Sequence, residues 1–243
     1  MNNQTPPQSS NLKNSVIPWK LIIRFIFTTV FMLAILFLAA GTLDWWEAWA
    51  YAAMTMLILL SSRAIMIMKN PDLALERGAS ADQKEGVKPW DKILMPLTAL
   101  YLPLISWVVA GLDERFGWSP DLPDSIQIVA LAVIILGSWF GTWAMITNRF
   151  FSSHVRIQTD RGHTVINTGP YRIIRHPGYA GGVLSWLAAP VFFSSWWLII
   201  PTVLAIILSI LRTYLEDQTL LKELPGYKEY ASEVPFRLIP GIW

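Results

Sequence analysis

Long uncharged runs constrain the fold of this 243-residue chain more than any other feature. The runs at residues 25–43, 93–112 and 125–148 each approach or exceed the roughly 20 residues that a helix needs to cross a bilayer. A further run at residues 48–62 is shorter, but Glu47 and Arg63 at its ends can extend toward the membrane surface. Hydrophobic residues make up 53% of the chain and charged ones only 15%, so we predict membrane helices at all four places.

The fifth uncharged run, residues 177–211, is too long for one membrane helix. As a single helix it would measure about 52 Å, against a hydrocarbon core of about 30 Å. Pro190, Ser194, Ser195 and Pro201 interrupt it, which predicts two helices in a hairpin. The expected fold is therefore an all-α, polytopic integral membrane protein with about six transmembrane helices, of which the last two form this hairpin.

Positive charges fall on one side of the predicted membrane protein. If the N-terminus is cytoplasmic, the loops at 63–92 and 149–175 and the C-terminal tail are cytoplasmic too, and of the 19 Lys and Arg only Arg115 lies on the other side. This distribution follows the positive-inside rule and predicts cytoplasmic termini. The net charge of +2 thus reflects the topology in the membrane and not a nucleic-acid-binding surface. We therefore expect no nucleic acid partner.

Cysteine and histidine usage excludes several kinds of chemistry. The chain has no cysteine, so disulfides, thiolate catalysis and Cys-ligated metals are excluded. The three histidines, His154, His163 and His176, have a spacing that matches no helical metal-ligand pattern. We expect no metal.

The chain is expected to form one integrated domain with three parts. Residues 1–18 are polar and resemble a disordered cytoplasmic tail. Residues 19–148 carry the four N-terminal membrane helices, and residues 149–243 carry the cytoplasmic segment and the hairpin. The first apolar run exceeds the 7 to 15 residues usual in a signal peptide, so we expect it to remain as an anchor.

Polar residues crowd against the start of the hairpin. Pro177 suits the first turn of a helix, where its missing N–H would be unpaired anyway. The amides of that turn, with Arg175 and His176 beside them, can bind a carboxylate or a phosphate. Gly181 and Gly182 permit close approach of a helix or a ligand. We interpret this segment as half of a cofactor pocket.

The other half is predicted at the end of the last span. Arg212 and Glu216 are four residues apart and share a helix face. A structural ion pair at the membrane edge is the alternative, but charges so close to the membrane are costly, which favours function. Arg212, Arg175 and Glu216 are the candidate catalytic residues.

The order HTVINTGPYRIIRHPGYAG, then RTYLED, PGYKEY and VPFRLIP, resembles the isoprenylcysteine carboxyl methyltransferase family and its bacterial relatives. These are integral membrane enzymes that use S-adenosylmethionine, and the resemblance covers about residues 150–243. The Arg-His-Pro-x-Tyr core alone also resembles segments of phospholipid N-methyltransferases and sterol reductases. The resemblance implies a bacterial inner-membrane enzyme whose active site faces the cytoplasm.

The resemblance also implies roles for individual residues. Arg212 would face the acceptor, and Glu216 would contact the cofactor. A glutamine early in the loop would contact it too; Gln158 is the match, with Arg156 as the alternative. The remaining cofactor contacts would be His163, Thr164, Val165, Ile166, Tyr171, His176, Pro177, Gly178 and Tyr179.

The acceptor would be a membrane lipid or a lipidated or otherwise hydrophobic molecule. If the reacting group is a carboxylate, no general base is needed; an amine would require one, with His176 and Glu216 as candidates. The rival functions are an NADPH-dependent reductase of the sterol-reductase type, a phospholipid N-methyltransferase, and a non-catalytic membrane protein of the same fold. The sequence leaves the oligomeric state open.

Overall fold

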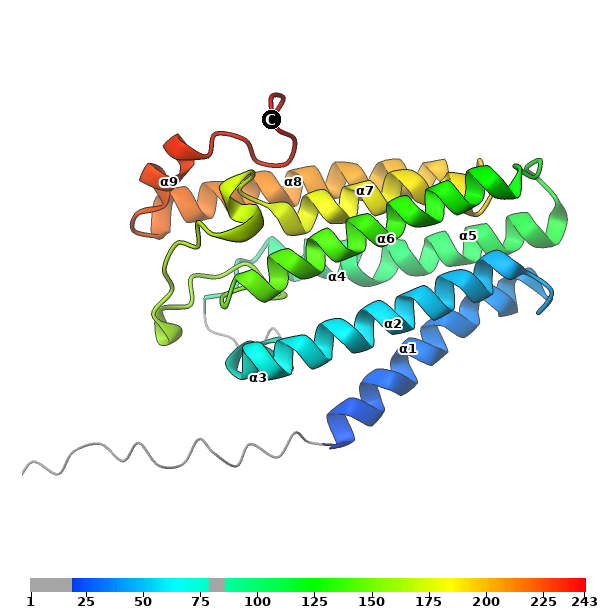
Figure 1. The fold of residues 1–243 in the computed structure, drawn as a ribbon, viewed down its shortest axis with the longest axis horizontal. Helices are drawn as coiled ribbons and strands as arrows, with labels where there is room; N and C mark the ends of the chain where they lie inside the picture. Colours follow the sequence, from blue (N-terminus) through cyan, green and yellow to red (C-terminus); the bar gives the residue numbers. More distant parts are fainter. Residues whose placement is uncertain (1–18, 79–85) are drawn as a thin grey trace, which may run out of the picture.

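The computed structural model describes residues 19–78 and 86–243, and within them every regular element is helical (Figure 1). The predicted tail at 1–18 lies outside the described residues. The helices are α1 (Trp19–Ala40), α2 (Trp46–Lys69), α3 (Pro71–Gly78), α4 (Asp91–Pro96), α5 (Leu102–Phe116), α6 (Asp124–Thr147), α7 (Pro177–Phe192), α8 (Ile199–Glu223) and α9 (Tyr227–Glu233). A π-helical turn, Leu97–Tyr101, joins α4 to α5 in one continuous helix. The all-α prediction is confirmed.

Four helices in the described part of the chain are long and apolar enough to cross a membrane. They are Trp46–Lys69, Asp91–Phe116, Asp124–Thr147 and Ile199–Glu223. α7 has only 16 residues and measures about 24 Å, which is shorter than a hydrocarbon core. α1 has 22 residues, but the structure does not describe all of its side chains. The count of six spans therefore stays a prediction.

The C-terminal hairpin forms where the sequence predicts it. α7 ends at Phe192 and α8 begins at Ile199, with Ser194 between them at a positive φ of 49°. The turn is anchored by side chains of other helices, since the Ser194 hydroxyl accepts from the Gln127 amide at 2.7 Å and the Ser195 hydroxyl donates to Asp113. These bonds fix the hairpin to α5 and α6.

α7 packs directly on α6 through small residues. A Cβ on Gly181 would lie 2.3 Å from the Gly137 carbonyl oxygen, so the two backbones meet where no larger side chain fits. Close approach of this kind is a common way for membrane helices to associate. The contact holds the start of α7, at Pro177, beside the end of α6.

The polar segments gather at one end of the helices (Figure 1). The short connections α1–α2, α5–α6 and α7–α8 lie at one end, whereas α3, the segment between α6 and α7, and α9 lie at the other. The loops that we predicted to share one side of the membrane are thus at the same end of the molecule. Which compartment this end faces stays a prediction.

Candidate functional site

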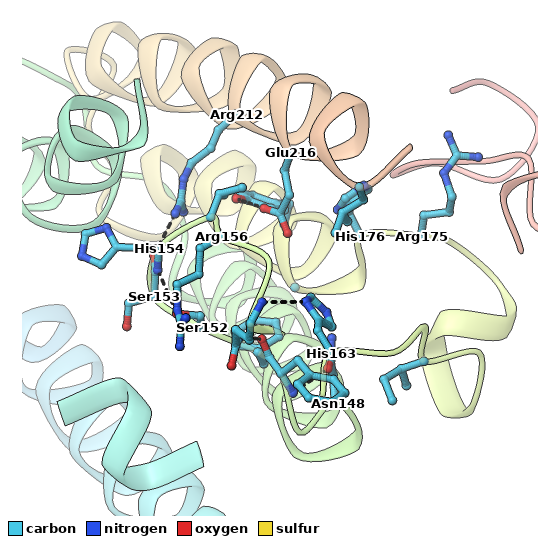
Figure 2. Close-up of a pocket in the computed structure, with 18 of the residues that line it drawn as sticks. Asn148, Ser152, Ser153, His154, Arg156, His163, Arg175, His176, Arg212 and Glu216 are labelled. Carbon is cyan, nitrogen blue, oxygen red and sulfur yellow. Dashed lines mark hydrogen bonds between the residues drawn. The ribbon is translucent and has the colours of Figure 1, made fainter. Parts of the chain in front are cut away.

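A cavity of about 420 Å³ opens at the polar end, between the 148–166 segment and the ends of α7 and α8 (Figure 2). The predicted cofactor residue Pro177 is fully buried in the first turn of α7 and does not line it. All the other predicted site residues do, namely Gln158, His163, Thr164, Val165, Ile166, Tyr171, Arg175, His176, Gly178, Tyr179, Arg212 and Glu216. Segments distant in the sequence are therefore brought to one place.

Gln158 shapes the loop that forms one wall of the cavity. Its side-chain amide donates to the Phe150 carbonyl at 2.6 Å, and its carbonyl accepts from Arg161 at 2.5 Å. The Arg156 guanidinium also lines the cavity, but it is paired with Glu76 at 3.0 Å and with Asp160. Both side chains thus have partners within the chain, and Gln158, with Arg156 as the alternative, stays a prediction for the early loop position.

His163 is held as a neutral imidazole. Its Nδ1 accepts from the Gln158 backbone N–H at 3.3 Å, and its ring lies 4.5 Å from that of Phe150. Burial lowers the pKa of His163 to about 4, with a further contribution from the positive charges of Arg156 and Arg161. The imidazole can therefore accept a hydrogen bond at neutral pH without carrying a charge.

Arg212 and Glu216 on α8 line the same wall but have separate partners. Arg212 Nε donates to Asp91 at 2.6 Å and Nη2 to the Ser153 carbonyl at 2.8 Å. Glu216 accepts from the Tyr179 hydroxyl at 2.7 Å, and the Arg212 guanidinium lies 5.5 Å from the centre of the Tyr179 ring. Within the described residues, Arg212 and Glu216 do not form the ion pair that the sequence offered as an alternative.

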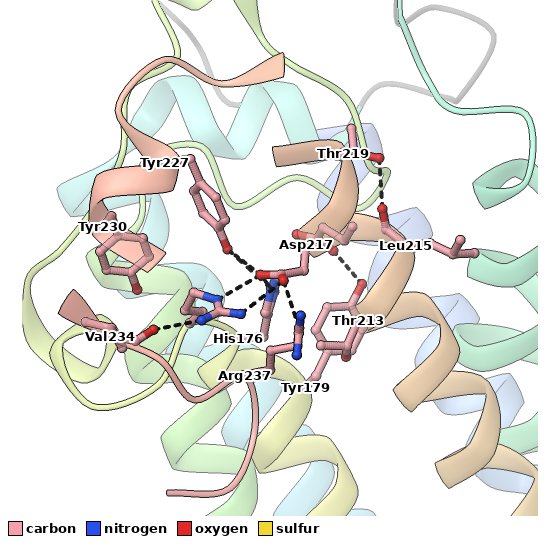
Figure 3. A network of polar contacts seen from close by, with 12 residues as sticks. His176, Tyr179, Thr213, Leu215, Asp217, Thr219, Tyr227, Tyr230, Val234 and Arg237 are labelled. Carbon is pink, nitrogen blue, oxygen red and sulfur yellow. Dashed lines mark hydrogen bonds and ion pairs between the residues drawn. The ribbon is translucent and has the colours of Figure 1, made fainter. Parts of the chain in front are cut away.

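Asp217 is the centre of a buried polar network behind the cavity (Figure 3). Its carboxylate accepts from Arg175 at 2.8 and 3.0 Å, from Arg237 at 2.8 Å and from the Tyr227 hydroxyl at 2.9 Å. His176 Nε2 lies 3.1 Å from the same carboxylate. The network ties the start of α7, the end of α8 and the C-terminal segment together.

The network changes the interpretation of two arginines. Arg175 also donates to the Val234 and Pro235 carbonyls, both at 2.8 Å, so its guanidinium is directed to the C-terminal segment although it borders the cavity. Arg237, to which the sequence analysis gives no role, pairs with buried Asp217. Both arginines hold the C-terminal segment against the start of α7 and the end of α8.

Sequence reasoning missed Asp91, the partner of Arg212. It begins α4, is fully buried, and also accepts from the Val155 backbone N–H at 2.7 Å. No motif marks this aspartate, and 121 residues separate it from Arg212. A lone acidic residue at the start of an apolar run was the only signal.

Within the described residues, no group of three His, Cys, Asp or Glu side chains could hold a metal ion.

Comparisons with known proteins found similarity to methyltransferases. Residues 126–225 match the phospholipid methyltransferase family. With its membrane-like helices, the C-terminal part of the chain is therefore similar to membrane methyltransferases. Over 65 residues, 26% of this chain, it is 35% identical to two rice proteins, from Oryza sativa subsp. indica and subsp. japonica, each named probable protein-S-isoprenylcysteine O-methyltransferase. The aligned stretch spans 34% of each rice protein. The resemblance to the isoprenylcysteine methyltransferases is confirmed.

Proposed function

We propose that this protein is an integral membrane methyltransferase that uses S-adenosylmethionine and acts on a membrane-borne acceptor. The observation that carries the proposal is the gathering of the predicted cofactor and acceptor residues on one cavity at the end of apolar helices. Such a cavity is open to a water-soluble cofactor and close to an acceptor held in the membrane. In this proposal the site faces the cytoplasm of a bacterial inner membrane, because the cationic residues concentrate at this end.

The cavity suits the cofactor in size and chemistry. A volume of about 420 Å³ lies within the range of small-molecule sites. When bound, S-adenosylmethionine supplies a methyl group on a sulfonium that is already an activated leaving group. Glu216 offers a carboxylate and Tyr179 an aromatic face to a cation, while His163 offers a neutral ring. These residues need only to position the reactants and exclude water.

Arg212 is the proposed acceptor-binding residue. Its Nε and Nη2 are occupied by Asp91 and Ser153, whereas no hydrogen bond engages Nη1 within the described part of the chain. Nη1 can therefore donate to the acceptor. An acceptor carboxylate would gain a charge-assisted bond and would need no general base. In this scheme Arg175 is a positioning residue that holds His176 and the C-terminal segment in place.

An amino group of a phospholipid is the second candidate acceptor, and the family match at 126–225 favours it. An amine must lose a proton, so a base is required. His176 is held against Asp217 and Tyr227, whereas the Glu216 carboxylate borders the cavity with Tyr179 as its partner. Glu216 is therefore the better-placed base of the two.

Cofactor binding tests the proposal directly. We expect the purified protein in nanodiscs to bind S-adenosylmethionine and its demethylated product in the micromolar range, about 8 kcal/mol by calorimetry. Binding of reduced nicotinamide cofactors instead would favour the reductase. Folded protein that binds neither S-adenosylmethionine nor a nicotinamide cofactor would favour the non-catalytic membrane protein.

Two single variants separate the cofactor from the acceptor. Glu216→Gln should weaken cofactor binding by about 1.5 to 3 kcal/mol, because a charged hydrogen bond is lost. Arg212→Ala should leave that binding nearly unchanged and abolish methyl transfer. Calorimetry and transfer of a radiolabelled methyl group to membrane lipid extracts would measure the two effects. Unchanged affinity in Glu216→Gln would remove Glu216 from the cofactor site.

A further inference from the structure

A fourth arginine, in addition to Arg156, Arg175 and Arg212, borders the cavity. Arg77 lies in the last turn of α3 and lines the cavity together with Phe151. Its Nη1 donates to the Phe151 carbonyl at 3.2 Å, and its guanidinium lies 5.5 Å from the centre of the Phe151 ring. Its Nε is buried and has no hydrogen-bond partner among residues 19–78 and 86–243. None of the resemblances assigns a role to this residue.

The adjacent Glu76 carboxylate partly offsets the positive charge of Arg77, but it makes no hydrogen bond to the buried Nε. The Glu76 carboxylate instead accepts hydrogen bonds from Arg156 at 3.0 Å and from the Ser152 hydroxyl at 2.8 Å. Burial, with the nearby charges of Arg63 and Arg212, lowers the pKa of Arg77 to about 10, so the group remains a cation at neutral pH. A cation with a buried N–H group that lacks a partner is stabilised by an anion.

The surroundings hold Arg77 rigidly in place. The Asn70 amide between α2 and α3 donates to the Ile146 carbonyl at the end of α6 at 2.9 Å. The bonds of Glu76 to Arg156 and Ser152 fix α3 to the 149–158 segment. An arginine that is already positioned loses little conformational freedom when it binds a ligand.

We infer that Arg77 binds a phosphate ester of the membrane-borne acceptor, a group separate from the one that is methylated. This inference rests on the proposed function. Glu216 and Tyr179, which we assign to the reacting end, come from α8 and α7, whereas Arg77 comes from α3. A carboxylate that is to be methylated must lie at the reacting end, so it does not supply the anion at Arg77. A phosphate has several oxygens, one of which can accept from Arg77 Nε while Arg212 Nη1 remains for the reacting group.

Native mass spectrometry of the full-length protein tests the inference. The protein would be released from micelles containing phosphatidylethanolamine, diacylglycerol with the same chains, or N-acetylfarnesylcysteine. We expect wild-type protein to retain phosphatidylethanolamine in preference to diacylglycerol, and Arg77→Gln to retain it at least about tenfold less. Arg77→Lys should restore part of the retention, because it keeps the charge. Arg172→Gln is the matched control, since Arg172 is an exposed arginine outside the cavity.

The affinity for S-adenosylhomocysteine, measured on the same preparations, reports whether each variant is folded and whether the proposed function holds. Unchanged affinity with lost phospholipid retention in Arg77→Gln supports the phosphate site. Equal phospholipid retention by wild type and Arg77→Gln overturns it, as does Arg77-dependent retention of N-acetylfarnesylcysteine alone. If no variant binds S-adenosylhomocysteine but retention still depends on Arg77, the proposed function fails and the anion site stands.

Discussion

Asp217 is the residue on which the geometry behind the site most depends. One carboxylate with no exposed side-chain area faces Arg175 and Arg237, and the bonds join α8 to segments before α7 and after α9. Buried ion pairs add little net stability when complete, but removing one partner leaves charges uncompensated. The importance of Asp217 is therefore structural, and it borders the site without lining the cavity.

We predict that Asp217→Asn is strongly destabilising. The neutral amide leaves both arginines without an anion, at a cost of about 3 to 5 kcal/mol. The melting temperature should fall by roughly 6 °C or more. Glu223→Gln is the control, because it breaks the exposed Lys88–Glu223 pair and should cost no more than about 1 kcal/mol. Equal melting temperatures for the two variants would contradict the central role of Asp217.

His163 should make stability depend on pH. Its pKa is about 4 in the fold, below the ordinary value of 6.5, so between these values the unfolded chain binds a proton that the folded protein excludes. The stabilisation is present above pH 6.5 and is lost as pH falls toward 4. Thermal melting between pH 7 and pH 4.5 should show a smaller loss of stability in His163→Gln than in wild type. The same pH slope in both proteins would show that His163 titrates normally.

At the scale of elements, adjacent glycines in α7 have different functions. Gly181 faces the backbone of α6, where a Cβ would lie 2.3 Å from the Gly137 carbonyl oxygen. A Cβ on Gly182 would meet nothing within 4 Å, and this residue borders the cavity. The pair GG in the sequence therefore combines one helix-packing position with one position open to a ligand.

We predict that Gly181→Ala lowers the melting temperature whereas Gly182→Ala does not. The first change pushes α7 away from α6, at a cost typical of overpacking, about 1 to 3 kcal/mol. The second adds a methyl group in open space on the same helix, so it is the matched control. Differential scanning fluorimetry in detergent measures both. An equal effect of the two changes would show that the α6–α7 contact is looser than the structure has it.

At the scale of the whole molecule, orientation in the membrane is the property that charge alone predicts. Single cysteines at exposed Asn167 and Ser125 can be introduced into this cysteine-free chain. With an impermeant reagent on intact cells that lack an outer-membrane barrier, Ser125→Cys should be labelled and Asn167→Cys should not. Permeabilised cells provide the control, since both positions should then react. Labelling of Asn167→Cys alone on intact cells would show that the protein has the opposite orientation in the membrane.

The sequence by itself determined four of the membrane-helix segments, the break between α7 and α8 and the start of α7 at Pro177. These features depend on the length of local uncharged runs and on the position of proline, so neighbours along the chain suffice to specify them. The motif around His176 and Glu216 also indicated which segments form the cavity. The length of α7 did not follow from the sequence, since this helix has only 16 residues.

Only the tertiary structure decided which polar groups pair. Arg212 and Glu216 share a helix face, yet Arg212 pairs with Asp91, 121 residues away, and Glu216 bonds to Tyr179. Arg175 finds Asp217 across 42 residues. A charge that leaves water takes whichever partner the packing of helices brings within hydrogen-bond distance, and the order of residues along one helix does not specify that partner.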